Sequence, residues 1–320
     1  MQEPPELSII IVNWNTRDLL RDCLNSVYAE TKATPFEVFV VDNASSDSSA
    51  EMVKREFPQV RLIENKDNLG IGRGNNQAIR ESTGTYIVLL NPDTLVLSGA
   101  LDKLAAFMRA HPHTDASAPT LLNPDGSPQP SVRERYSFNY CVEFLLMQSL
   151  ATYLPRLLVS KWGKRETHSR HPRQVAWVSG ACVMARRETV DKVGLLDERY
   201  FLFADDTDWC YRLRQLGGRI CFMPEAGIIH YGGQSVKQTD TGLENSYQSR
   251  YLFMKKHYGK VQAYFFRIMV AIDCFVAMCV IPLLQTALRG DRRREIKWKS
   301  RSRRRGLLWA IGRGEASLLR

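Results

Sequence analysis

Strand-length apolar runs alternate with helical segments through the first 97 residues, and this alternation constrains the fold more than any other feature of the chain. The helical segments lie near 16–29, where apolar residues recur at helical spacing, near 46–57, and from about 75 onward. The apolar runs are LSIIIVN (7–13), FEVFVVD (36–42), VRLIE (60–64) and TYIVLL (85–90). Strands that are apolar on both faces are typical of a parallel sheet covered by helices on both sides. The sequence therefore predicts an α/β fold.

Each of these apolar runs ends in polar residues. In chain order the polar ends are Asn13, Asp42, Asn68 with Gly70, and Asn91-Pro92-Asp93. One Asn-Pro-Asp segment by itself is an ordinary turn. The carboxyl ends of successive parallel strands, however, meet at one edge of the sheet, which is where open α/β sheets bind ligands. We therefore expect a ligand site at this edge.

The composition is that of a globular protein, since 44% of the 320 residues are apolar and 24% are charged. The seven cysteines form no C-x-x-C pair and several lie in apolar runs. We therefore expect reduced core cysteines rather than disulfides or a zinc site. Residues 1–6 are polar and the next apolar run is only strand-length, so no signal peptide is expected.

The formal net charge of +10 belongs to the C-terminal tail. From Arg289 onward twelve Lys and Arg stand against three acidic residues, which leaves about +1 for residues 1–288. The preceding run, 268–288, is apolar and long enough to span a bilayer, but it contains Asp273, Pro282 and Gln285. An interfacial helix with a polybasic patch on anionic lipid is favoured over a span. A tail that packs on the protein or binds a partner is the remaining alternative.

A second ordered block, 177–233, follows a segment (133–176) in which aromatic, Leu and basic residues show no clear period. Within this block Asp205, Asp206 and Asp208 stand at the expected start of a helix that ends at Gly217-Gly218. The positive end of a helix dipole favours carboxylates, but three of them within four residues repel one another. A nearby metal ion or substrate hydroxyl accounts for the cluster, and a solvated capping turn is the alternative.

The common phosphate-binding motifs do not occur. There is no G-x-x-x-x-G-K-[ST], and GIGRGN (70–75) lacks the dinucleotide spacing, although its glycines permit close approach of the backbone to a ligand. Asp42-Asn43 either contacts a base or ribose or forms an Asx turn before the next helix. Asp93 is a hard oxygen ligand, suited to Mg²⁺ or Mn²⁺ together with a diphosphate. His230 ends an apolar run and either adds a metal ligand or is structural.

Seven motifs, taken in order, resemble family 2 inverting glycosyltransferases, which have the GT-A fold with a Rossmann-like, mostly parallel sheet. The motifs are IIIVNWN, VVDNASSD, NLGIGRGNN, LLNPDT, WVSGA, FLFADDTDWCYRL and HYGGQS. They span about residues 7–235, and the likeness is greatest to rhamnosyltransferase-like enzymes of bacterial cell-surface polysaccharide assembly. The resemblance implies a GT-A domain over 1–235, with a nucleotide-binding half (1–97) and an acceptor half (98–235). C-terminal helices, membrane-associated through 268–288 and the basic tail 289–320, would occupy 236–320.

The resemblance implies a role for each matching residue. Asp93 would hold the metal, with Asn91 in place of the first acid of the family's D-x-D motif and His230 completing the metal site. Asp206 matches the acidic residue proposed as catalytic base in the family. Its acidic neighbours Asp205 and Asp208 would support it, although relatives often have Glu at the position of Asp205.

The nucleotide would be bound by the loops after the first three strands. Asp42 would contact the base, with Asn13 beside it. The residues implied for the ribose and diphosphate are Asn68, Gly70 and Asn75. Arg73 stands where relatives often have a small residue, so it either contacts the diphosphate or only changes the loop.

The implied reaction is a Mg²⁺- or Mn²⁺-dependent transfer of a sugar, with inversion, to a hydroxyl of a lipid-linked glycan. It would take place at the cytoplasmic face of a bacterial plasma membrane. The resemblance favours dTDP-rhamnose as the donor, and a UDP-hexose is the alternative. No nucleic acid is expected as a partner, because the folded part lacks interleaved aromatic and basic residues. A non-catalytic scaffold on the same fold is the other alternative.

Overall fold

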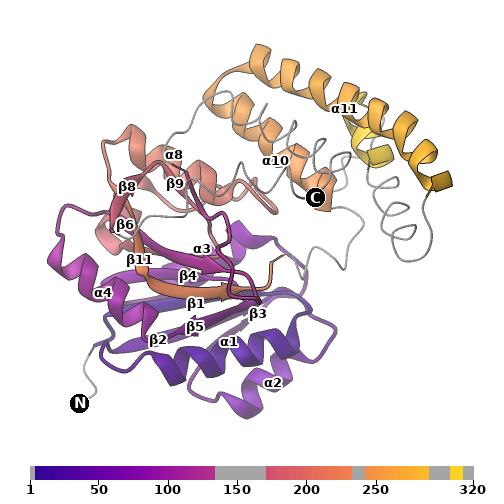
Figure 1. The fold of residues 1–320 in the computed structure, drawn as a ribbon. Coiled ribbons are helices and arrows are strands. Elements are labelled where there is room, and N and C mark those ends of the chain that lie inside the picture. The colour runs from indigo at the N-terminus through magenta and orange to yellow at the C-terminus, as the bar shows by residue number, and fades with distance from the viewer. Residues whose placement is uncertain (1–3, 134–170, 233–241, 288–302, 313–320) are drawn as a thin grey trace. The chain divides into compact units, whose positions relative to one another are not determined.

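The computed structural model describes residues 4–133, 171–232, 242–287 and 303–312. The chain divides into two compact units. The described residues of the first unit come from Met1–Tyr136, Gly163–Glu198 and Asp205–Ser235, and those of the second from Arg199–Ala204 and Val236–Arg320. Figure 1 shows the elements of both units.

A single sheet organises the first unit. Its nine strands among the described residues are β1 (Leu7–Asn13), β2 (Phe36–Asp42), β3 (Arg61–Glu64), β4 (Tyr86–Leu90), β5 (Thr94–Leu97), β6 (Ala116–Leu122), β8 (Arg173–Val175), β10 (Cys182–Arg186) and β11 (Ile220–His230). The order is β3-β2-β1-β4-β10-β6-β11-β5, and β8 pairs with β11. β3, β2, β1 and β4 are parallel, as are β6 and β11, whereas β10, β5 and β8 run antiparallel to their neighbours. The predicted mostly parallel sheet is confirmed.

Helices cover both faces of this sheet, as predicted. Side chains alternate along β1, so that Ile9 and Ile11 pack in one core and Ile10 and Val12 in the other. The first core is closed by α1 (Arg17–Glu30), α2 (Ser49–Glu56) and α4 (Ala100–Ala110). The second is closed by α3 (Ile71–Glu81), α7 (Arg187–Val193) and α8 (Asp205–Gln215). Burial on both faces explains why the β1, β2 and β4 sequences are continuously apolar.

The strand β11 contains an irregularity that bears on the site. It pairs with β6 in parallel, Met223 opposite Pro119 and Gly227 opposite Thr120, so that residues 224–226 are extra relative to β6. Beyond this bulge β11 continues to His230, which pairs with Thr94 at the start of β5. A small second sheet joins β7 (Val132–Arg133) to β9 (Trp177–Val178).

The second unit is helical in its described part. α10 (Gly242–His257) packs along α11 (Lys260–Ala287), and a further helix covers 303–310. The stretch Lys260–Cys279 of α11 is the one helix among the described residues that is long and apolar enough to cross a membrane, with a mean hydropathy of 1.6. The same property also belongs to core helices of soluble proteins, so it does not by itself establish a span.

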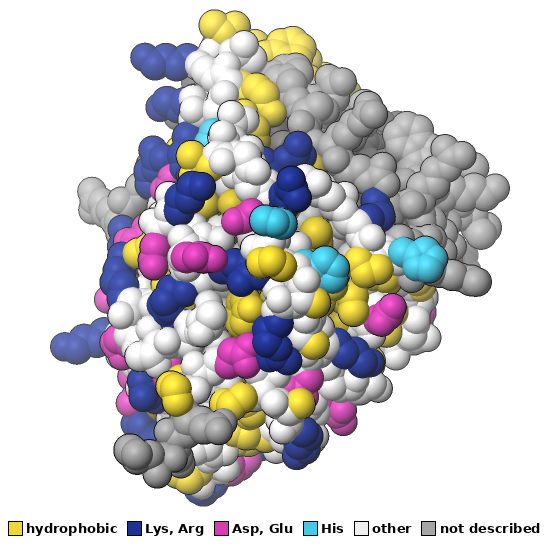
Figure 2. Space-filling view, turned by 90° about the vertical axis from the view of Figure 1, so that its left-hand side faces the viewer, with side chains coloured by type: hydrophobic (Ala, Val, Ile, Leu, Met, Phe, Trp, Pro, Cys, Tyr) yellow, Lys and Arg dark blue, Asp and Glu magenta, His cyan; other side chains and the backbone are white. Residues whose placement is uncertain are grey.

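Charged side chains of both signs are mixed over the described part of the face drawn in Figure 2. Many form ion pairs at the surface, such as Arg109 with Glu6 at 2.8 Å and Lys54 with Glu64 at 2.7 Å. Exposed pairs of this kind contribute little to stability, because solvent and salt screen the two charges. The six described cysteines are free thiols, four of them buried.

Candidate active site

The sheet topology brings the predicted polar residues to one edge. The carboxyl ends of β1, β2, β3, β4, β6 and β11 lie on the same edge because β10 is antiparallel to both β4 and β6. The first residues of β5 and β10 lie on this edge too, since these two strands run the opposite way. The loops that carry the predicted residues therefore lie along a single edge of the sheet.

Asn13 and Asp42 are neighbours at the ends of β1 and β2. They face each other in the strand register, and Asn13 Nδ2 donates to Asp42 Oδ1 at 2.9 Å. The other carboxylate oxygen of Asp42 accepts from the backbone N–H of Ser45 at 2.9 Å, which is the Asx-turn geometry. Both side chains are buried. Each carboxylate oxygen retains a second lone pair, so Asp42 is held in place and can still accept from a ligand.

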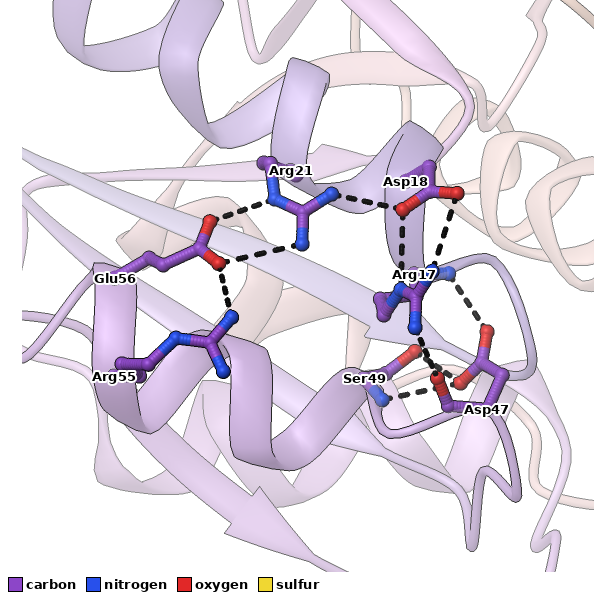
Figure 3. Close-up of polar contacts among 7 residues, drawn as sticks. All are labelled: Arg17, Asp18, Arg21, Asp47, Ser49, Arg55 and Glu56. Carbon is purple, nitrogen blue, oxygen red and sulfur yellow. Dashed lines mark hydrogen bonds and ion pairs between the residues drawn. The ribbon is translucent and has the colours of Figure 1, made fainter.

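The loops after β1 and β2 are tied to each other. The backbone N–H of Arg17 donates to Asp47 at 2.8 Å, and Asp47 also accepts from the Ser49 hydroxyl at the start of α2 (Figure 3). Asn15 accepts from the backbone of Ser46 at 2.7 Å. These bonds fix the loop that follows Asp42 against the start of α1, and so hold Asn13 and Asp42 in register.

The loop after β3 leads into α3 through Gly70. This residue has a φ of 82°, a conformation that favours glycine, and its N–H donates to Asn68 Oδ1 at 3.0 Å. A Cβ at Gly74 would lie 2.8 Å from Val12 Cγ1, so a glycine there lets α3 approach β1 closely. Asn43 Nδ2 donates to the Gly70 carbonyl at 3.2 Å, which ties the turn after β2 to the start of α3.

Asn75 and Arg73 lie on α3 in different surroundings. Asn75 is buried. Arg73 is half-exposed, with its guanidinium 3.6 Å from Glu198. The Glu198 carboxylate also accepts from Arg80 at 3.1 Å and from the buried Asn76 at 3.0 Å. Both arginines hold the pKa of Glu198 below its usual range, with the Asn76 bond as the largest cause. The positive charge of Arg73 is therefore already partly compensated by the Glu198 carboxylate.

Asp93, Asn91 and His230 come together where β4, β5 and β11 meet. His230 Nε2 lies 3.3 Å from Asp93 Oδ1 and 3.4 Å from Asn91 Nδ2. The backbone supports this approach, because the N–H of Tyr231 donates to the Asp93 carbonyl at 2.9 Å. Asp93 is buried, with 6% of its surface exposed. Three residues predicted from separate motifs thus form one cluster.

Gln129 orients the His230 ring. Its amide nitrogen donates to Asn123 Oδ1 at 3.1 Å and to the His230 carbonyl at 3.3 Å, which turns Gln129 Oε1 toward His230 Nδ1 at 2.7 Å. An amide oxygen only accepts, so Nδ1 carries the proton, and in the neutral ring Nε2 presents a lone pair. That lone pair faces the Asp93 carboxylate. Two acceptors at this distance repel each other unless a metal ion lies near both or a proton on Nε2 makes the contact an ion pair.

These residues fit a divalent cation. A metal-binding histidine donates its second N–H to a fixed acceptor, which is what Gln129 provides. Within the described ranges, no group of three or more His, Cys, Asp and Glu side chains is arranged to hold a metal. Asp93 and His230 would therefore hold the ion with further oxygens from a diphosphate, the usual way Mg²⁺ and Mn²⁺ bind at phosphate sites.

Asp206 forms a second cluster with the turn between β9 and β10. Its carboxylate accepts from the N–H of Gly180 at 2.9 Å and from the N–H of Thr207 at 2.6 Å. Burial raises the pKa of Asp206, and these donors oppose that rise. Burial also raises the pKa of Asp205 to about 7, and the charge of Asp206 adds to it. Both side chains keep part of their surface exposed, so a carboxylate pair whose pKa values are raised is open to a substrate.

The two clusters share one short backbone segment. The N–H of Asn91 donates to the Ala181 carbonyl at 3.0 Å, and the neighbouring Gly180 holds Asp206. A Cβ at Gly180 would lie 3.2 Å from Asp206 Cβ, which leaves little room for any side chain there. Gly180 and Gln129 contact the predicted site residues directly, although neither was singled out from the sequence.

Asp208 has a different environment from its two acidic neighbours. It is fully buried, and its carboxylate accepts from Arg212 Nε at 2.8 Å. The Arg212 guanidinium also donates to the carbonyls of Val193 at 2.7 Å and Leu195 at 2.7 Å. The pair thus ties α8 to the end of α7.

We expect Asp208→Ala to destabilise the protein rather than to abolish chemistry selectively. Removing one partner of a buried ion pair leaves the other charge uncompensated, at a cost of about 3 kcal/mol. For a unit of this size the melting temperature should fall by about 6–10 °C in differential scanning calorimetry. Asp22→Ala, at an exposed aspartate on α1, is the control and should leave it unchanged. An unchanged melting temperature with lost activity would instead place Asp208 in the chemistry.

Comparisons with known proteins agree with this geometry. The sequence profile described as "Glycosyl transferase family 2" matches residues 8–194. The N-acetylglucosaminyl-diphospho-decaprenol L-rhamnosyltransferase of Mycobacterium tuberculosis is 27% identical over 91% of this chain and 97% of its own length. The dTDP-rhamnosyl transferase RfbF of Shigella flexneri is 24% identical over 67% of this chain and 66% of its own length.

A solved structure shows the same fold. The mannosyltransferase PcManGT of Pyrobaculum calidifontis, solved with GDP-Man and Mn²⁺, aligns with a TM-score of 0.54 at 17% identity. The alignment covers 97% of this chain and 87% of that structure. The predicted GT-A architecture is confirmed. Because the profile covers more than half of the chain, the protein belongs to glycosyl transferase family 2 and is a glycosyltransferase.

Proposed function

We propose that this enzyme transfers rhamnose from dTDP-rhamnose to a hydroxyl of a lipid-linked glycan during bacterial cell-surface polysaccharide synthesis. The reaction type is supported by one observation. The Asp93–His230 pair and Asp206 lie on either side of Gly180-Ala181 at one edge of the sheet. Support for the sugar and the acceptor comes from the mycobacterial relative, whose name specifies both a rhamnosyl group and a polyprenyl-diphosphate glycan. A UDP-hexose donor at the same site is the alternative.

Donor binding follows from the loops at the sheet edge. Asp42, held by Asn13, would accept from the nucleotide base, and Asn68, Gly70 and Asn75 would lie along the ribose and diphosphate. Asp93, His230 and Asn91 would hold Mg²⁺ or Mn²⁺, which when bound neutralises charge on the leaving diphosphate. Arg73 would act through Glu198, with which it is paired, rather than as a free cation.

The transfer itself needs a base beside the anomeric carbon. Asp206 would take the proton from the acceptor hydroxyl while the new C–O bond forms and the bond to the diphosphate breaks. Attack from the face opposite the leaving group inverts the configuration. The N–H groups of Gly180 and Thr207 fix the carboxylate before the acceptor arrives, and burial raises its pKa, which makes it a stronger base than an exposed carboxylate.

A lipid-linked acceptor would place the enzyme at the cytoplasmic face of the plasma membrane, where nucleotide-sugars are available. The segment 133–176, which belongs to the predicted acceptor half (98–235), lies largely outside the described residues. The predicted partition into a GT-A domain (1–235) and C-terminal helices (236–320) is part of this proposal. A catalytically silent scaffold, the alternative from the sequence, would retain its role in cells after Asp206 is replaced.

The proposal is tested with five donors: dTDP-rhamnose, UDP-glucose, UDP-galactose, UDP-GlcNAc and GDP-mannose. Each is measured for thermal stabilisation and for transfer to a polyprenyl-diphosphate-linked GlcNAc in detergent, with Mn²⁺, with Mg²⁺ and with EDTA. Metal-dependent stabilisation and transfer with dTDP-rhamnose alone is the expected result. Transfer with a UDP-hexose alone would replace the donor assignment. Absence of binding by every donor, in folded protein, would overturn the proposal.

Gln129 provides a prediction about the metal site. Gln129→Leu removes the acceptor for His230 Nδ1–H and should weaken Mn²⁺ binding about 10–100-fold. Binding is measured by isothermal titration calorimetry in the presence of dTDP, so that activity is not needed as a readout. The matched variant Gln129→Glu keeps an acceptor oxygen and should bind Mn²⁺ nearly as well as the wild type. Equal affinities for the Leu and wild-type proteins would show that the His230 ring does not depend on Gln129.

A further inference from the structure

The helix α11 has two sharply different faces along Lys260–Cys279. On one face, large apolar side chains recur at helical spacing and are exposed: Val261, Tyr264, Phe265, Ile268, Ile272, Phe275 and Val276, between 44% and 78%. Cys279, also exposed, continues the same row. We call these eight residues the apolar stripe. At 100° per residue they fall on one side of the helix. An exposed patch of this size on a folded protein marks an interaction site.

The opposite face of α11 is already occupied by protein. Ala263, Phe266, Val270, Cys274 and Ala277 are fully or almost fully buried. Asp273, which interrupts the apolar sequence, is paired with Arg303 of the helix at 303–310 and accepts from Tyr247 of α10 at 3.3 Å. The polar residue inside the apolar run is therefore neutralised within the unit and does not face the apolar stripe.

The neighbouring helix argues against a membrane span. α10 packs along α11 (Figure 1). It has 16 residues, which is about 24 Å of helix against a hydrocarbon core of about 30 Å. It also carries Glu244, Arg250 and Lys255. A helix of this length and polarity does not enter hydrocarbon, so the face of α11 that packs on it remains outside the hydrocarbon too.

Charge identifies the occupant of the apolar stripe. The described residues of 242–287 and 303–312 contain eight Lys and Arg against two acidic residues, and 289–302 adds seven Lys and Arg against two acidic residues. Two copies of so basic a unit repel each other, which disfavours a dimer through this face. Anionic lipid headgroups are attracted to such a unit, and the hydrocarbon just beneath them accepts the apolar side chains.

We propose that α11 lies flat on an anionic membrane surface, with the apolar stripe inserted at the boundary of headgroups and acyl chains. The inference rests on the proposed function, in which the acceptor glycan is linked to a membrane lipid. It goes further by naming the attaching residues and by assigning an in-plane orientation. One face of α11 would then hold the enzyme on the membrane that contains its acceptor.

The first test is flotation of the full-length protein with vesicles of phosphatidylcholine alone or with 30% phosphatidylglycerol, without donor or metal. Wild type should bind the anionic vesicles, and Ile272→Glu/Phe275→Glu should bind them at least about 100-fold more weakly, since two large apolar side chains are lost from the interface. Gln215→Glu/Leu216→Glu carries the same charge change at exposed residues of the first unit and should bind like wild type.

The alternatives have their own outcomes in that test. Equal binding by both double variants would overturn the assignment of the apolar stripe. A wild-type dimer in light scattering that becomes monomeric in Ile272→Glu/Phe275→Glu, without vesicle binding, would assign the stripe to a second copy. Because no sugar transfer is measured, failure here leaves the transfer of sugar to a detergent-dispersed acceptor untouched.

The in-plane orientation is tested by measuring how deeply two positions of α11 lie in the bilayer. A fluorophore on native Cys279, or on Val261→Cys with Cys279→Ala, in a Cys141→Ser/Cys221→Ser background, is quenched by lipids that carry spin labels at different acyl positions. The two sites are about 27 Å apart along the helix, at 1.5 Å per residue. A flat helix gives the same depth at both sites. Depths that differ by most of the hydrocarbon thickness would overturn the in-plane orientation in favour of a span.

Discussion

Asp206→Asn is expected to lower kcat for sugar transfer by about 10³-fold, because a general base typically contributes 10²–10⁴-fold. Donor binding, measured by thermal shift, should change little, since the nucleotide loops lie on the β1–β3 side of the sheet edge. The amide has one acceptor oxygen for the two N–H donors of Gly180 and Thr207, so the melting temperature is measured alongside. Asp22→Asn on the surface of α1 is the control and should retain full activity.

The pH dependence of kcat tests the same assignment from another side. A base must be unprotonated to act, and burial raises the pKa of Asp206 above its usual range. Wild-type kcat should therefore fall with decreasing pH at a higher pH than the value of about 4 expected for an exposed carboxylate. A profile that falls only near pH 4, or an Asp206→Asn enzyme with wild-type kcat, would remove the base role.

Asp93→Ala is expected to abolish metal-dependent stabilisation by the donor and to lower transfer by about 10³-fold or more. The reason is that Asp93 is the one carboxylate beside His230 in the proposed metal cluster, and a cation at the leaving diphosphate supplies several kcal/mol. The measurement pairs Mn²⁺ titration in the presence of dTDP with initial rates.

A matched control distinguishes the loss of a metal ligand from the loss of a negative charge alone. Asp22→Ala removes an exposed carboxylate on α1, outside this cluster, and it should leave both readouts at wild-type values. His230→Ala should resemble Asp93→Ala in direction. If Asp93→Ala binds Mn²⁺ and donor as the wild type does, then Asp93 and His230 form only a structural pair.

The sequence predicted the parallel part of the fold because strands that are buried on both faces have continuously apolar sequences, as β1, β2 and β4 do. It also predicted that Asn13, Asp42 and Asp93 would lie at one edge of the sheet, since each stands at the end of such a strand or just after it. The short strand β5, TLVL, was not predicted. Three apolar residues after a threonine carry no period, and the partner that makes this segment a strand, β11, lies more than a hundred residues away in the chain.

Other parts of the site depend on contacts that no local pattern encodes. Gln129 lies in PDGSPQP, whose composition indicates a turn and nothing more. Its role appears only when β11 brings His230 beside it. Asp208 is different, because Arg212 stands four residues later, a spacing that favours an ion pair on one helix face. That signal was present in the sequence and separates Asp208 from Asp206, which is two residues away and faces another direction.

The bulge in β11 has a consequence for how the length of this chain can change. Side chains alternate along a strand, and the three extra residues, 224–226, set the phase in which β11 reaches His230. Insertion or loss of one residue there inverts the alternation and turns the imidazole to the opposite side of the sheet, away from Asp93. Changes by two residues restore the phase. We therefore expect functional variants to gain or lose residues at this point of the strand in even numbers, because the His230 imidazole must stay on the side of Asp93.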